Sequence, residues 1–157
     1  MGIATHLGPW LLGTNRYTVG TTAADTRNTG ATQVVQTKAV AFNDADAANA
    51  FVLPAGSLIT SLRFITTTTF DQATTVTLSI GGTAITAALT VTSPGVYSFV
   101  AASTEAAAAL WANTGATDKF VTYTVAQGTS TAGVGQIVAE YVVRNSDGTM
   151  YQPAQQN

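Results

Sequence analysis

A strict alternation of apolar and hydroxyl side chains in TTVTLSIGG, residues 74–82, constrains the fold most. The apolar side chains of one parity are Val76, Leu78 and Ile80, and the hydroxyl side chains of the other are Thr75, Thr77 and Ser79. Successive side chains of a strand point to opposite faces of a sheet, so a period of two marks a strand with one buried face. This segment therefore predicts a half-buried β-strand.

Further segments carry the same β-strand signal. They are residues 33–42, 51–53, 58–70, 83–91, 95–101, 119–127 and 134–144. In residues 58–70, Leu58, Leu62, Phe64 and Phe70 share one parity, although Ile59 and Ile65 break it. Because residues 71–73 (DQA) predict a turn, we expect residues 58–70 and 74–82 to form a hairpin. In residues 119–127 we expect Val121, Tyr123 and Val125 to share one face. In the last segment we expect Ile137, Ala139, Tyr141 and Val143 to share the buried face.

One corner and one helix complete the expected elements. Pro54 fixes φ and Gly56 permits a positive φ, as a tight turn requires. Residues 103–113 (STEAAAALWAN) are the one helical candidate, capped by Ser103 or Thr104, with Leu110 and Trp111 as anchors. Seven or eight short strands and one short helix indicate an all-β fold, an antiparallel two-sheet sandwich with a jelly-roll topology. We place this domain at residues 32–145, between an extended N-terminal arm (1–31) and a polar C-terminal tail (146–157).

The N-terminal arm has no sustained period but is too apolar for a freely solvated tail. Its anchors are Ile3, Leu7, Trp10, Leu11 and Leu12. We expect it to dock, either on its own domain or on a neighbouring molecule.

The composition excludes several classes of function. Charged residues make up 9% of the chain, against roughly 25% in an average globular protein. The net charge of -2 and the scattered arginines argue against nucleic acid as a partner. There is no cysteine, and no apolar run long enough for a membrane span or layout typical of a signal peptide.

The residues that could carry chemistry are few. His6 is the only histidine and lies in the arm, and no known catalytic motif occurs. Asp44 and Asp46 could belong to a calcium loop or a glycosidase pair, but an ordinary turn explains them better. The tryptophans and tyrosines could line a sugar site, although core or interface anchoring is their more frequent use. We therefore expect no catalytic residues, no metal site and no cofactor, and hence no enzyme.

Threonine dominates the expected surface. The chain holds 29 threonines but two lysines, Lys38 and Lys119. Thr66–Thr69, with Thr74, Thr75 and Thr77, would form a flat, uncharged outer face. Monomeric proteins usually carry charged side chains that protect the exposed edges of their sheets from pairing. Because such charges are nearly absent here, we expect neighbouring molecules to cover the faces and edges of this sheet. The alternative is that the domain is rich in threonine only because the proteins of its source generally are.

Three stretches also carry a resemblance. They are ATHLGPWLLGT (4–14), LPAGSLITSLRFITTTTFDQATTVTLSIGG (53–82) and YTVAQGTSTAGVGQIVAEYVV (123–143). Together with residues 34–42 they resemble small virion structural proteins of tailed bacteriophages, and most closely the capsid decoration or cement type.

The resemblance implies a homo-oligomer, often a trimer, on the outer capsid surface, with the major capsid protein as partner. The absence of cysteine suits assembly in the host cytoplasm. The arm would then reach to the shell or to a sister subunit. A head- or tail-fibre module that binds a host receptor or glycan is the alternative.

Overall fold

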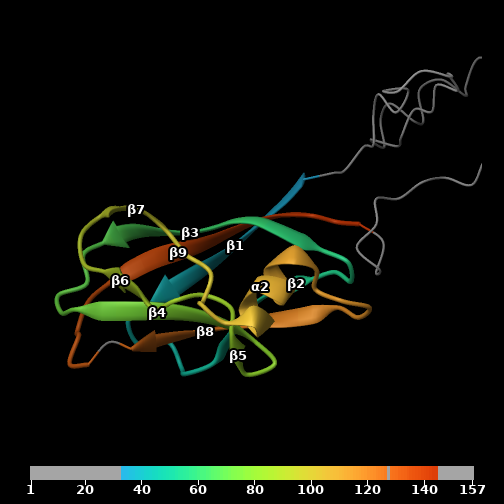
Figure 1. Cartoon of the computed structure of the whole chain (residues 1–157). Coiled ribbons are helices and arrows are strands. Elements are labelled where there is room, and N and C mark those ends of the chain that lie inside the picture. The colour runs from blue at the N-terminus through green and yellow to red at the C-terminus, as the bar shows by residue number, and fades with distance from the viewer. Residues whose placement is uncertain (1–32, 127, 145–157) are drawn as a thin grey trace, which may run out of the picture.

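The structure is a computed structural model that describes residues 33–126 and 128–144. This part of the chain forms nine strands and one helix (Figure 1). The strands are β1 (Gln33–Ala41), β2 (Ala48–Leu53), β3 (Leu58–Thr68), β4 (Thr74–Ile80), β5 (Thr83–Ala84), β6 (Leu89–Val91), β7 (Gly95–Ser98), β8 (Lys119–Ala126) and β9 (Val134–Val142). The helix is α2 (Glu105–Ala112).

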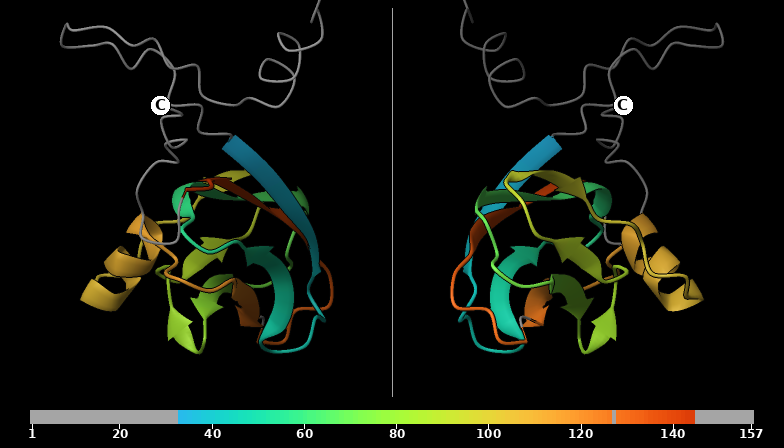
Figure 2. Two further views of the ribbon diagram at one scale, coloured as in Figure 1. Left: turned by 90° about the vertical axis from the view of Figure 1, so that its right-hand side faces the viewer. Right: turned by 90° about the vertical axis from the view of Figure 1, so that its left-hand side faces the viewer.

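The strands form two antiparallel sheets that lie face to face (Figure 2). Sheet A has the order β1-β9-β3-β7. Sheet B has the order β2-β8-β4, and β5 and β6 pair with opposite ends of β4. The all-β sandwich predicted from the sequence is therefore confirmed.

The strand pairs are nested along the chain. β1 pairs with β9, β2 with β8, β3 with β7, and β4 with β5 and β6. The chain thus behaves as a long two-stranded ribbon wound around the core, with each successive pair in the other sheet. This order is that of a jelly roll.

The hairpin expected between residues 58–70 and 74–82 is wrong. β3 pairs with β7 and β9 in sheet A, whereas β4 pairs with β8, β5 and β6 in sheet B. Residues 69–73 therefore carry the chain from one sheet to the other. Two strands that each have one apolar face can bury those faces across a sandwich as well as side by side, so alternation alone does not distinguish the arrangements.

An irregularity in β3 explains why its parity is broken. The register with β9 shifts between Ile59 and Ser61. On either side of the shift, Ile59 and then Leu62 and Phe64 are buried. The expectation that Leu58 shares the face of Leu62 is therefore wrong, because the bulge reverses which parity points inward.

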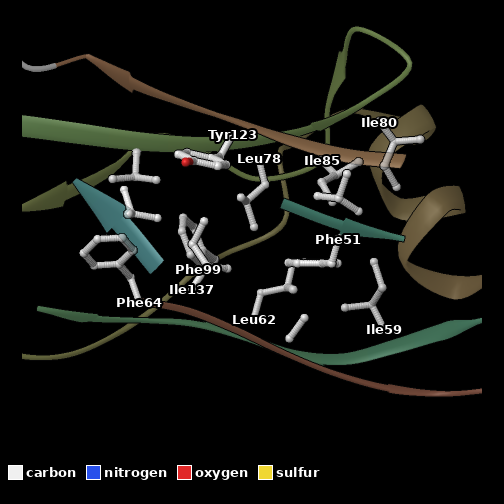
Figure 3. Close-up of a cluster of buried hydrophobic side chains, with 14 of the residues drawn as sticks. Phe51, Ile59, Leu62, Phe64, Leu78, Ile80, Ile85, Phe99, Tyr123 and Ile137 are labelled. Carbon is white, nitrogen blue, oxygen red and sulfur yellow. The ribbon is translucent and has the colours of Figure 1, made fainter. Parts of the chain in front are cut away.

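The core lies between the two sheets (Figure 3). Tyr123 and Leu78 of sheet B face Leu62, Phe64 and Ile137 of sheet A. The expected inward faces of β4 and β8 are confirmed, and so is that of β9 up to Tyr141. Val143 lies beyond the end of β9 and is exposed, so its expected burial is wrong.

The predicted helix is present and is held at both ends. The Thr104 hydroxyl accepts a hydrogen bond from the Ala107 N–H at 3.2 Å. The Trp111 Nε1–H donates to the Ile85 carbonyl at 2.8 Å, and Leu110 packs on the core beside it. No helix in residues 33–126 or 128–144 is long and apolar enough to cross a membrane.

The expected corner is a tight turn. The Ser57 N–H donates to the Pro54 carbonyl at 3.2 Å, and Gly56 has a φ of 73°. This is the pattern of a type II turn with glycine at its third position. The Thr114 hydroxyl donates to the same Pro54 carbonyl at 2.8 Å, which ties the corner to the segment after the helix.

Candidate interaction surfaces

The outer face of sheet A is rich in valine, and we call it the valine face. The strand register places on it Gln33, Val35, Thr37, Ala39, Ala41, Leu58, Ser61, Arg63, Ile65, Val96, Ser98, Val134, Gln136, Val138, Glu140 and Val142. The alternate residues of the same strands point into the core. The valine face therefore covers one whole side of the described domain.

Several of its apolar side chains meet solvent. Val96 is 64% exposed, Val35 56% and Val134 42%. Single exposed valines are ordinary on a protein surface, but these three share one face with Val138, Val142 and Ile65. Polar side chains, among them Ser61 and Gln136, lie between these apolar residues, so the valine face is mixed in character. Several exposed apolar side chains on one face are still typical of an interaction site.

One ion pair lies within the valine face. The Arg63 guanidinium contacts the Glu140 carboxylate, to which the Gln33 amide also donates at 3.1 Å. These two are the charged residues that the described strands place on this face. Because the pair is neutral as a unit, the valine face has no net charge to repel an apolar partner.

The outer face of sheet B differs in chemistry, and we call it the threonine face. It comprises Asn49, Val52, Thr75, Thr77, Ser79, Ala84, Thr90, Phe120, Thr122, Thr124 and Ala126. Within the described strands, no charged side chain lies on it. Hydroxyl side chains can pair with a neighbour at a small desolvation cost.

The predicted run of outward threonines is partly wrong. Thr66 and Thr74 are buried, at 3% and 0% exposed, whereas Thr67 to Thr69 are exposed. Thr74 points inward because it shares the parity of Val76 on β4. The uncharged outer face is instead built from β4 and β8 together, which residue order within one segment cannot show.

The two edge strands of sheet A differ in their charged residues. β1 carries Lys38, which the alternation places on the inward side of that edge strand. An inward-pointing charge is one way in which proteins protect a sheet edge from pairing. The opposite edge strand, β7, and the run from Gln72 to Thr104 contain no charged residue.

The carboxylate of Asp44 serves the fold. Asp44 accepts hydrogen bonds from the Ala41 N–H at 2.8 Å and from the Tyr123 hydroxyl at 2.6 Å. Burial of Tyr123, together with this bond to Asp44, raises the pKa of its phenol above the ordinary range. Asp44 therefore holds the β1–β2 turn on β8, while Asp46 is exposed.

Asp71 forms a second clamp, which the sequence analysis missed. Its carboxylate accepts hydrogen bonds from the Ser130 and Thr131 hydroxyls and from the Thr131 and Ala132 N–H groups. These bonds, that from Ser130 above all, hold the pKa of Asp71 well below its usual range. The clamp joins the β3–β4 crossover to the β8–β9 loop.

The described residues bring together little that could perform chemistry. In residues 33–126 and 128–144, no three His, Cys, Asp or Glu side chains lie close enough to share a metal ion. Tyr123 and Tyr141 are buried, and Trp111 packs on the core. Phe120 is the exposed aromatic of the threonine face, at 64%, paired across strands with Val52.

The predicted arm contacts are not among the described residues. Ile3, Leu7, Trp10, Leu11 and Leu12 lie outside them, as do His6, the arm 1–31 and the tail 146–157.

Comparison of the chain with protein-family models, with curated proteins and with solved structures found no match. The valine face is therefore the main candidate surface. The sequence signal that could have found it is the set of valine, isoleucine and leucine residues at the outward positions of β1, β3 and β9.

Proposed function

We propose that this protein is a non-enzymatic structural component of a tailed-phage virion, a capsid decoration or cement protein. It would bind the major capsid protein from the outer surface of the shell and associate with copies of itself, as a trimer. The observation that carries the proposal is that both outer faces of the sandwich are without net charge. A domain that met only water would normally carry many more charges.

The two faces suit different contacts within such a shell. The threonine face offers hydroxyl groups that can pair with a protein neighbour, and the valine face offers apolar area. The nested strands make the domain a rigid block, and the apolar residues 3–12 supply a clamp with Trp10 as its principal anchor. Such a clamp would bridge capsid subunits, with most of the binding energy coming from a few aromatic and aliphatic anchors.

The test uses purified protein and empty shells of the virus that encodes it. We expect the full chain to co-sediment with shells, and a variant that lacks residues 1–12 to stay in the supernatant while retaining its β-sheet circular dichroism. Undiminished loading of the truncated variant would remove the arm from the mechanism. A full chain that remains monomeric and binds no shell would overturn the assignment itself.

A fibre module that binds a glycan is the second candidate. The observation that favours it is Phe120, an exposed ring with a threonine hydroxyl side chain, Thr122, two residues along β8. Aromatic faces of this kind stack on ligands. If this function holds, Phe120→Ala abolishes retention on a glycan array and leaves shell loading unchanged; the decoration function predicts no retention for either form.

A further inference from the structure

We propose that, in the free protein, residues 3–12 of the chain lie across the valine face of the same molecule. This inference does not rest on the proposed function, because it concerns the unassembled chain. Under the proposed function, it adds that the arm must leave this face before it can bridge neighbours.

The first argument is that the valine face needs a cover. Val35, Val96 and Val134 are exposed on it, and its two charges neutralise each other. Several exposed apolar side chains on one face of a monomer are typical of a surface that another segment or molecule covers. The threonine face exposes one large apolar side chain, Phe120, among hydroxyl groups that water hydrates well.

The second argument is one of chemistry. The anchors Ile3, Leu7, Trp10, Leu11 and Leu12 are apolar, and no Asp, Glu, Lys or Arg precedes Arg16 in the chain. Burying this segment against valines therefore removes apolar area from water on both sides and desolvates no formal charge.

The third argument is one of length. β1 and β9 are nine residues long, so the valine face runs for about 30 Å along the strands. Residues 3–12 span about 33 Å when extended, which matches the face. The chain joins the face at one end, because Gln33 pairs with Val142 in its first row.

The linker favours the same molecule over a second copy. Residues 13–32 separate the segment from β1, and a flexible chain of twenty residues has a root-mean-square length of about 25 Å. This is close to the length of the face, the condition under which effective concentration is highest, at about the millimolar level. Free protein at micromolar concentration offers a second copy far less often.

Engineered disulfides test the contact, because the natural chain has no cysteine. The full chain is made with Leu7→Cys and Thr37→Cys, the latter being exposed midway along the edge strand β1 of the valine face. The matched control combines Leu7→Cys with Thr90→Cys, which is exposed on the threonine face. We expect the first pair to close an intramolecular disulfide at least about tenfold faster under mild oxidation, since docking raises the local thiol concentration.

Each other outcome overturns the proposal. Equal rates for the two pairs would mean that the segment does not prefer the valine face. A disulfide that migrates as a covalent dimer on a non-reducing gel would assign the face to a second copy.

A second measurement does not depend on cysteine geometry. Acrylamide quenching of Trp10, obtained as the difference between the natural chain and Trp10→Phe, should show a shielded indole. Val96→Asp with Val134→Asp should at least double its quenching constant, because the charges disfavour an apolar cover. Thr77→Asp with Thr90→Asp, on the other face, should leave it unchanged. A Trp10 as accessible in the natural chain as in a free peptide of residues 1–14 would contradict the docking.

Discussion

Gly133 stands at a position where a side chain does not fit. Its φ of 143° is rarely adopted by other residues, and a Cβ added there would overlap the ring of Phe70. We expect Gly133→Ala to lower the free energy of unfolding by about 2–3 kcal/mol, because overpacking and backbone strain act together. Urea denaturation measures the loss.

Gly82 provides the control for that substitution. Its φ of 82° is also positive, but nothing lies within 4 Å of an added Cβ. Gly82→Ala should therefore cost only the backbone term, about 1–2 kcal/mol. Equal losses of unfolding free energy at the two positions would show that the Phe70 ring moves aside at no cost.

Asp71 makes the fold sensitive to acid. Hydrogen bonds lower its pKa in the folded state, so its stabilisation is complete above its unfolded pKa of about 3.9 and is lost as pH falls below that value. Asp71→Asn should lower the melting temperature at pH 7. The melting temperature of the variant should also fall less steeply between pH 5 and pH 2 than that of the natural chain. A parallel decline in the variant would contradict the role of this carboxylate.

The helix α2 depends on its N-cap and on tertiary packing. It has eight residues, too few to be stable alone. Thr104→Ala removes the acceptor for the Ala107 N–H and should cost about 1 kcal/mol. The neighbouring Ser103→Ala is the control, with an expected change within about 0.5 kcal/mol, because no hydrogen bond of the Ser103 side chain is found in the described structure. Thermal unfolding followed by circular dichroism distinguishes the two.

The whole molecule is dominated by contacts between distant parts of the chain. The outermost strand pair joins Gln33 to Val142, and the next pairs are nested inside it. Non-local pairing slows folding, because loop entropy is lost before the contacts form. We expect refolding in milliseconds to seconds rather than microseconds, measured by stopped-flow fluorescence of Trp111 in the Trp10→Phe background. A microsecond phase that recovers the full signal would contradict the nested order.

Local features were predictable where one segment contains the whole pattern. The inward faces of β4 and β8, the Thr104 cap and the Pro54–Ser57 turn each follow from a few neighbouring residues. The Asp71 clamp was not predictable, because its donors at Ser130 and Thr131 lie on a loop about sixty residues further along the chain. The valine face was missed for the same reason, since it is assembled from four strands.

The sequence by itself determined that the chain forms half-buried strands with one short helix, because side-chain alternation and capping act over a few residues. Only the tertiary structure decided which strands pair, and therefore that β3 and β4 separate into different sheets. It also decided which parity of β3 faces inward, through the bulge after Ile59. The physical reason is that the apolar face of a strand requires burial but does not specify its partner, which is selected only when the whole core closes.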